Sequence, residues 1–315
     1  MRVSTREDNA GSRRTRVADR ASIESLTDTL ARFIAYIGKH LPTDVEAKLA
    51  ELRGKETRPL AKAIYESMAE NQEAAARLDR PSCQDTGVLQ YFLTAGARFP
   101  LLGDLENVLR EATLEATRRS PLRHNAVETF VERNTGTNTG TKVPWLDWEI
   151  TPGDDGVTID VYMAGGGCTL PGSATVLMPG EGYEGIVDFV FEVITSRGVN
   201  ACPPLLVGIG VSGTVESAAR LSKKALMRPL GSHHPDPSAA RMETLLEEGL
   251  NELGIGPQGL TGTSSVLGVH IESSARHPST IGVAVSTGCW SHRRGRIRVN
   301  ADLSCEIVSH HGAVL

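Results

Sequence analysis

The segment Asn134-Thr135-Gly136-Thr137-Asn138-Thr139-Gly140 separates two halves of the sequence that carry different hydrophobic patterns. Before it, over about residues 21–130, apolar residues recur at helical spacing. After it, stretches such as Val157-Thr158-Ile159-Asp160-Val161-Tyr162 alternate in the way that is typical of paired strands. We therefore expect an α+β fold, in which a helical N-terminal half is followed by a mixed β-sheet region with interspersed helices.

The same patterns set the expected boundaries. Residues 1–20 are rich in arginine and lack the apolar region of a secretory signal, so we expect a disordered polar tail. The remainder should form a helical lobe over about residues 21–135 and a sheet-containing lobe over about residues 136–315. In the second lobe, strands are predicted at 174–178, 205–210, 266–271 and 280–286, and helices at 183–197, 214–225 and 237–253.

Composition excludes some classes of partner. At 315 residues and 40% hydrophobic content the chain can bury a large core. The net charge of -5 gives no basic patch for nucleic acid, and no apolar run reaches the ~18 to 20 residues that a membrane helix needs. Five cysteines without disulfide-framework spacing suit a reducing compartment. We expect a cytoplasmic protein that binds neither nucleic acid nor membranes.

Three cysteines lie in separate loops rich in glycine or proline. Cys83 is in Pro81-Ser82-Cys83-Gln84-Asp85-Thr86-Gly87, Cys202 in Ala201-Cys202-Pro203-Pro204, and Cys289 in Thr287-Gly288-Cys289-Trp290-Ser291-His292-Arg293-Arg294. Three thiolates can hold a cubane iron–sulfur cluster and leave one iron open to act as a Lewis acid. Spacing alone leaves the alternative that these are buried packing cysteines. Cys305, within an expected strand, is assigned to packing.

Other residues indicate where an anion could bind. The loop Ala164-Gly165-Gly166-Gly167-Cys168 follows a predicted strand, and its backbone N–H groups could face a carboxylate, although a bulge would use the same glycines. Arg123 and His277 each lie near a proline at an element boundary. An arginine suits a dicarboxylate and a histidine can carry a proton, but a surface arginine and a core histidine are the commoner outcomes.

Six ordered motifs together resemble the alpha chain of the iron–sulfur hydro-lyases, a family that includes class I fumarases and tartrate dehydratases. The resemblance implies that residues 21–315 form one alpha-type catalytic domain. Around Cys168 the chain is similar to the tartrate branch, whereas fumarases usually have a serine there. The motifs are Cys83–Gly87, Pro121–Val127, Asn134–Gly136, Gly165–Gly167, Ala201–Pro204 and Cys289–Arg293.

The resemblance also implies a cofactor and a set of site residues. Cys83, Cys202 and Cys289 would hold a [4Fe-4S] cluster with one open iron. Asp85 together with His277 would handle a proton on the leaving-group side. The residues placed around the bound dicarboxylate are Gln84, Asp85, Arg123, Gly166 and His277.

The implied reaction is the dehydration of tartrate to an enol that tautomerises to oxaloacetate. Single-chain fumarases of this family carry a second, beta-type domain, so we expect a separate beta subunit, an α2β2 assembly and an active site between the chains. Two alternatives stay open: the alpha subunit of a two-chain class I fumarase, and a non-catalytic protein that binds zinc or an iron–sulfur cluster.

Overall fold

The computed structural model describes residues 20–315, so the expected tail lies outside the described residues except for Arg20. Three helices follow in succession: α1 (Arg20–Lys39), α2 (Thr43–Lys55) and α3 (Pro59–Leu78). Leu26, Leu30, Phe33 and Ile37 recur along α1 at helical spacing and are buried, which confirms the helical pattern of this part of the chain.

The first sheet has five strands in the order β11-β10-β5-β1-β4. Only the β1–β4 pair is parallel. Strand β1, next to the edge strand β4, lies in the half of the sequence that we expected to be mainly helical, and it pairs with strands from the other half. The strands are β1 (Val88–Gly96), β4 (Trp145–Thr151), β5 (Val157–Ala164), β10 (Arg294–Val299) and β11 (Cys305–Ile307).

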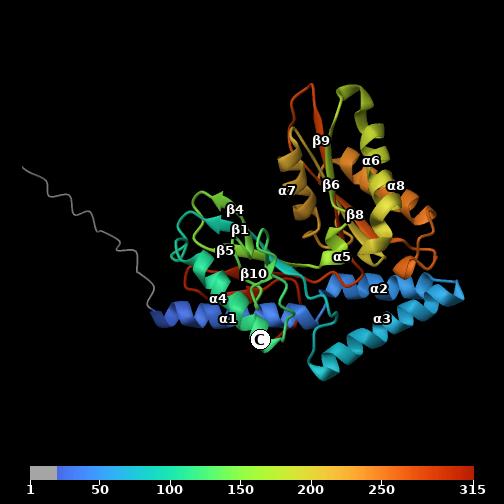
Figure 1. The fold of residues 1–315 in the computed structure, drawn as a ribbon. Coiled ribbons are helices and arrows are strands. Elements are labelled where there is room, and N and C mark those ends of the chain that lie inside the picture. Colours follow the sequence, from blue (N-terminus) through green and yellow to red (C-terminus); the bar gives the residue numbers. More distant parts are fainter. Residues whose placement is uncertain (1–19) are drawn as a thin grey trace, which may run out of the picture.

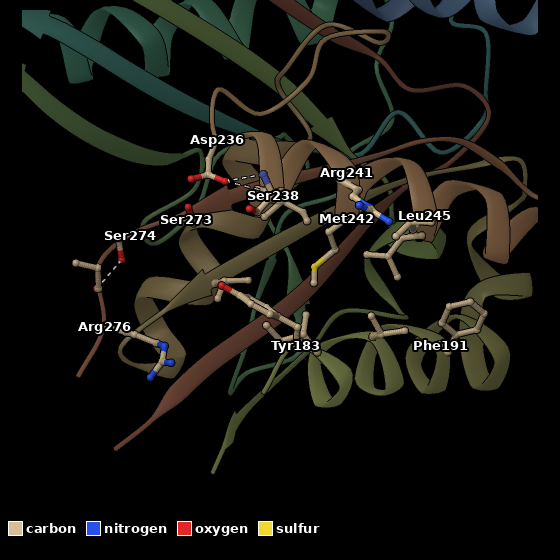
Figure 2. A pocket seen from close by; sticks show the side chains of 17 residues that line it. Tyr183, Phe191, Asp236, Ser238, Arg241, Met242, Leu245, Ser273, Ser274 and Arg276 are labelled. Atoms are coloured by element: carbon tan, nitrogen blue, oxygen red, sulfur yellow. Dashed lines mark hydrogen bonds between the residues drawn. The ribbon is translucent and has the colours of Figure 1, made fainter. Parts of the chain in front are cut away.

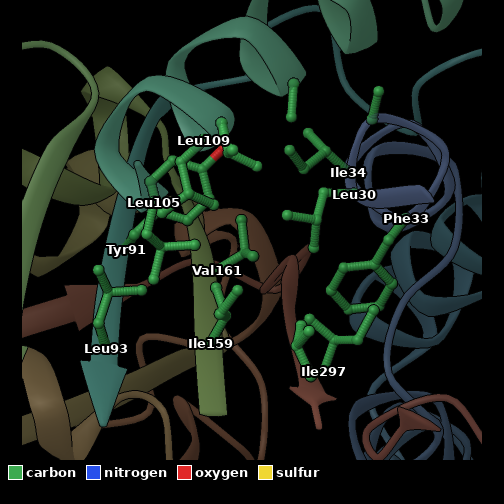
Figure 3. Close-up of a cluster of buried hydrophobic side chains, with 14 of the residues drawn as sticks. Leu30, Phe33, Ile34, Tyr91, Leu93, Leu105, Leu109, Ile159, Val161 and Ile297 are labelled. Atoms are coloured by element: carbon green, nitrogen blue, oxygen red, sulfur yellow. The ribbon is translucent and has the colours of Figure 1, made fainter. Parts of the chain in front are cut away.

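Helices α1 and α4 (Leu105–Arg119) lie along this sheet (Figure 1), and their apolar side chains pack into one core with those of the strands. Leu30 and Phe33 of α1 point toward Ile159 and Ile297 on neighbouring strands (Figure 3). All four side chains are at most 1% exposed, so this layer is a dry core that fixes the position of β5 and β10.

The second sheet has four strands in the order β6-β9-β7-β8. Helices α6 (Gly182–Arg197) and α8 (Pro237–Glu252) pack on one face, and α7 (Val215–Ala225) packs on the other (Figure 1). On the α7 face, a Cβ at Gly210 would lie 1.9 Å from the Ala218 carbonyl oxygen, so glycine allows this close approach. The strands are β6 (Ser173–Leu177), β7 (Leu205–Ser212), β8 (Val266–Ser273) and β9 (Ile281–Gly288).

The fold class and the elements expected in the second lobe are therefore confirmed, with boundaries that differ by one or two residues. Short elements complete the chain: β2 (Val127–Glu128), β3 (Arg133–Asn134), α5 (Gly166–Thr169), and 3-10 turns at Pro179–Glu181, Gly198–Ala201 and Pro257–Gly259. Cys305 packs against the first core, as expected. None of the helices in residues 20–315 has the length and apolar character needed to span a bilayer.

Candidate functional site

Four loops meet where the two sheets adjoin. The loop before β1 carries Cys83, the turn after β5 carries the glycines, the residues before β7 include Cys202, and the link from β9 to β10 carries Cys289. Sheet register explains the meeting, since Val88 pairs with Ala164 in the first sheet and Leu206 pairs with Gly288 in the second. Antiparallel pairing thus brings all three predicted cysteine ligands to one junction.

Backbone hydrogen bonds fasten these loops to one another. Trp290 N donates to Cys202 O at 3.1 Å, and Met163 N donates to Arg293 O at 3.1 Å. Cys202 itself has φ 53° and ψ 73°, a left-handed conformation that is uncommon for a cysteine. A strained residue held by its neighbours is a frequent feature of functional sites, because the surrounding structure has to stabilise it.

A fourth thiol joins the three expected ones. Cys168 is 5% exposed, and its thiol donates to Gly165 O at 3.2 Å. A hydrogen bond with Cys289 lowers the pKa of Cys168 and raises that of Cys289. Burial raises the pKa of Cys202, and negative charge on Cys83, Cys168 and Asp85 raises it further. The junction therefore gathers four thiols and a carboxylate, of which Cys168 had been noted only as a family signature.

Asp85 is held by the glycine turn. Its Oδ2 accepts from Gly166 N at 2.7 Å and its Oδ1 accepts from Gly87 N at 3.1 Å. A Cβ at Gly165 would lie 3.1 Å from Oδ2, which explains the need for glycine beside this carboxylate. The N–H group that we expected to meet a substrate carboxylate is thus bound to a carboxylate of the chain itself.

Two cations face the thiols: Arg293, which follows Cys289 in its loop, and Lys223, which sequence reasoning did not single out. Arg293 is 2% exposed, and its charge lowers the pKa of both Cys168 and Cys289, although hydrogen bonding has the larger effect on each. Lys223 of α7 lies with its Nζ 5.5 Å from the centre of the Tyr162 ring. Burial lowers the pKa of Lys223, and the charge of Cys168 opposes that shift. The site is therefore suited to an anionic group.

Arg123 and Gln84 also lie near the junction. Arg123 N donates to the Thr86 hydroxyl at 2.9 Å, which places Arg123 next to the loop of Asp85. Its guanidinium has no hydrogen-bond or ion-pair partner among residues 20–315 and is exposed. Gln84 is exposed beside Cys83, whose thiol lies 3.5 Å from the Gln84 Oε1.

His277 lies elsewhere. It follows β8, whereas Cys202 precedes the parallel strand β7, so the two residues stand at opposite ends of the second sheet. The whole of β9 separates His277 from Cys289, and eight strand residues span about 27 Å. The side chain is exposed, and its Nδ1 accepts from Ser279 N at 3.1 Å. One chain therefore does not bring His277 to the other expected residues.

A cavity of about 520 Å³ opens at the His277 end of the sheet. Tyr183 and Phe191 of α6 face Met242 and Leu245 of α8 across it, and Arg276 lies at its edge (Figure 2). No residue lining the cavity comes from the cysteine loops. Within the described part of the chain, no three side chains of His, Cys, Asp or Glu are arranged to hold a single metal ion.

Comparison with known proteins gives a consistent result. A family model described as fumarate hydratase (Fumerase) matches residues 27–298. The L(+)-tartrate dehydratase subunit alpha of Escherichia coli (strain K12) is 59% identical over 294 residues, covering 93% of this chain and 97% of that protein. A putative L(+)-tartrate dehydratase subunit alpha of Methanocaldococcus jannaschii is 34% identical over 281 residues, covering 88% of this chain and 98% of that protein.

Proposed function

Because the chain belongs to the fumarate hydratase (Fumerase) family, we propose that it is the alpha subunit of an L(+)-tartrate dehydratase, a hydro-lyase that converts L(+)-tartrate to oxaloacetate. The observation that carries the proposal is the meeting of the Cys83, Cys202 and Cys289 loops around Asp85 at the junction of the sheets. The choice of tartrate rests on the names of the similar subunits and on Cys168, where the family resemblance separates the tartrate branch from fumarases.

The residues at the junction fit a [4Fe-4S] cluster held by Cys83, Cys202 and Cys289. The thiolates of a cubane bind different irons, so they do not need to converge on one point as the ligands of a single ion do. Cys168 is the thiol that we leave out of the ligand set, since it is buried and donates within its own turn to Gly165 O. When bound, the cluster supplies one open iron that acts as a Lewis acid toward the leaving hydroxyl.

The protein groups then have separate tasks. Asp85 is positioned to give a proton to the hydroxyl that leaves as water. General acids at typical sites raise the reaction rate by roughly 10²- to 10⁴-fold. Arg123, whose guanidinium is unpaired, would bind a substrate carboxylate, with Gln84 beside it. For Gly166 N–H to bind the substrate, it has to exchange the Asp85 carboxylate for that of the substrate. As the hydroxyl leaves as water, a base removes the proton from the neighbouring carbon, and the resulting enol tautomerises to oxaloacetate.

A beta subunit would complete the site in an α2β2 assembly. Gln84 and Arg123 are exposed at the junction, so a second chain can cover them. The curated relatives are called subunit alpha, which supports the existence of such a partner. His277 of one alpha chain would take part in proton transfer at the junction of another alpha chain, because its own chain holds it at the far end of the sheet. All five cysteines are free, which supports a cytoplasmic location.

The runner-up is the alpha subunit of a two-chain class I fumarase, favoured by the description of the family model. The deciding experiment is turnover by the anaerobically reconstituted chain, with and without its co-produced beta chain. Oxaloacetate from L(+)-tartrate only when both chains are present supports the proposal. Preferential interconversion of malate and fumarate selects the runner-up, and no turnover of any of these acids by a cluster-loaded pair of chains rejects both.

A further inference from the structure

Arg293 is buried without an anion. It lies in the link between β9 and β10 and is 2% exposed. One terminal nitrogen, Nη2, donates to the backbone oxygen of Asp85 at 2.6 Å. The other terminal nitrogen and Nε are buried and have no hydrogen-bond partner. Two of the three guanidinium nitrogens therefore have unused donors.

Two other arginines of residues 20–315, the buried Arg294 and the partly buried Arg228, each have an acidic partner. Arg294, the next residue, is 5% exposed and forms an ion pair with Asp44. Arg228 donates to Glu243 Oε1 at 2.8 Å. Arg293 forms no ion pair with any residue between 20 and 315. Burying a charge without a partner lowers the stability of the folded state by on the order of several kcal/mol. The native site should therefore contain an anion at this position.

The surroundings indicate which anion this is. Arg293 lies in the same link between β9 and β10 as Cys289, an expected cluster ligand. It also donates to the backbone oxygen of Asp85, two residues after Cys83, another expected ligand. A substrate carboxylate has the exposed Arg123 available to it, whereas Arg293 lies beneath the backbone of the Asp85 loop. A cluster of thiolates and sulfides carries negative charge on the buried side of the site.

We propose that Arg293 is a positioning residue that holds the iron–sulfur cluster, with its unused N–H groups donating to the sulfur atoms of the cluster. This inference rests on the proposed cluster. It adds that the positive charge of Arg293 offsets the negative charge of the cluster. Hydrogen bonds to the sulfurs and nearby positive charge favour the more negative, reduced form of such a cluster. Arg293 therefore stabilises the cluster and raises its reduction potential.

The test compares Arg293→Met, Arg293→Lys and Arg298→Met in the full chain co-produced with its beta chain. Arg298 is the matched control, because it lies on β10 but pairs with Asp154 away from the junction. We expect Arg293→Met to lose iron to a chelator at least about tenfold faster than the wild type, in the range seen for groups that support metal ligands. The rate of iron loss from Arg293→Lys should lie between those of Arg293→Met and the wild type. Arg298→Met should lose iron at the wild-type rate.

The reduction potential gives a second readout. In Arg293→Met the reduction potential of the cluster should fall by about 59 mV, which corresponds to a tenfold smaller equilibrium constant for one-electron reduction. Unfolding of the cluster-free chain supplies the third readout. There the same variant should be as stable as the wild type or more stable, since it no longer buries an unpaired charge.

Each other outcome overturns the inference. Equal destabilisation of the cluster-free and cluster-loaded forms would mean that Arg293 only supports the Asp85 loop. A raised KM for L(+)-tartrate, with unchanged iron retention and potential, would assign the missing anion to the substrate. If the wild type itself takes up no cluster, the proposed function fails; if the wild type and Arg293→Met retain the cluster equally, only the role of Arg293 fails.

Discussion

The two ends of the second sheet differ in their chemistry, although the same strands form both. At the junction end, Cys202 has a left-handed backbone and Arg293 is a buried cation with unused donors. At the far end, α6 and α8 line a largely apolar cavity, and the His277 loop is exposed. Natural sequences break local rules mainly at functional sites, so the strained and under-satisfied end is the one to associate with chemistry.

The core between the two ends has no such features. Val207, Ile209, Val283 and Val285 are at most 1% exposed and pack against α6 and α8. Substitutions there should alter stability but not the cluster. Substitutions at the junction should alter the cluster and catalysis at little cost in folding. The following experiments test this division.

Cys202→Ser should have the largest effect. Removing one of the three proposed thiolate ligands should abolish stable cluster binding and lower turnover of L(+)-tartrate at least about 100-fold. Iron and sulfide content and the visible absorption of the anaerobic protein provide the measurement. Cys305→Ser is the control, because this thiol packs on the first core away from the junction. Full iron content in Cys202→Ser would remove Cys202 from the ligand set.

Asp85→Asn should lower kcat by roughly 10²- to 10⁴-fold while KM changes much less, because the amide still accepts a hydrogen bond but cannot supply the proton. Steady-state kinetics on cluster-matched samples measure the effect. Asp79→Asn, at the end of α3, removes an exposed carboxylate paired with Lys39 and should leave kcat unchanged. An unchanged kcat in Asp85→Asn would assign proton handling to another group.

Mixing two inactive chains tests whether His277 acts from a second alpha chain. His277→Asn and Cys202→Ser chains, combined at equal amounts, should recover about one quarter of wild-type turnover. Half of the randomly paired dimers are hybrids, and each hybrid has one intact site. Turnover of the mixture is compared with that of each variant alone. No recovery, with hybrid formation shown by differently tagged chains, would exclude a site shared in this way.

The sequence predicts the order of elements better than it predicts the contacts of the site. Helical spacing placed α1, because this pattern follows from burial of one face of a helix. Short apolar runs placed β7 and β9, which are buried on both faces. β1 was missed within a mainly helical half, since its strand character depends on pairing with β4 and β5 from later in the chain.

The same reasoning explains the hits and misses at the site. Glycine and proline beside three cysteines indicated loops that converge, and the structure brings these loops together. The burial of Arg293 and the approach of Lys223 have no local signal, because both depend on elements distant in sequence. The hydrogen bond from Gly166 to Asp85 likewise joins residues separated by 81 positions.

Leu250→Ala tests the core between the ends. This side chain of α8 is 0% exposed, so its truncation should lower the free energy of unfolding by about 2–5 kcal/mol. Denaturant unfolding of the cluster-free chain measures the change, and iron content of the reconstituted protein should stay as in the wild type. Leu245→Ala on the same helix, where the side chain is 55% exposed, should cost much less. Loss of iron in Leu250→Ala would show that the two ends are coupled.

The smallest expected effect is a pH dependence that arises midway along β8, an edge strand of the second sheet. His270 of β8 is buried, and burial lowers its pKa to about 4, with Arg228, Arg294 and Glu243 as the charged groups that face it. The unfolded chain takes up a proton near pH 6.5, so the neutral folded form is fully favoured above that pH. The contribution of His270 to the free energy of unfolding should fall by on the order of 2–3 kcal/mol as the pH drops toward 4. His270→Gln should therefore lose less unfolding free energy than the wild type between pH 7 and pH 4, measured by denaturant titration of the cluster-free chain. Identical losses in the two proteins would mean that other buried histidines, such as His310, account for the acid sensitivity.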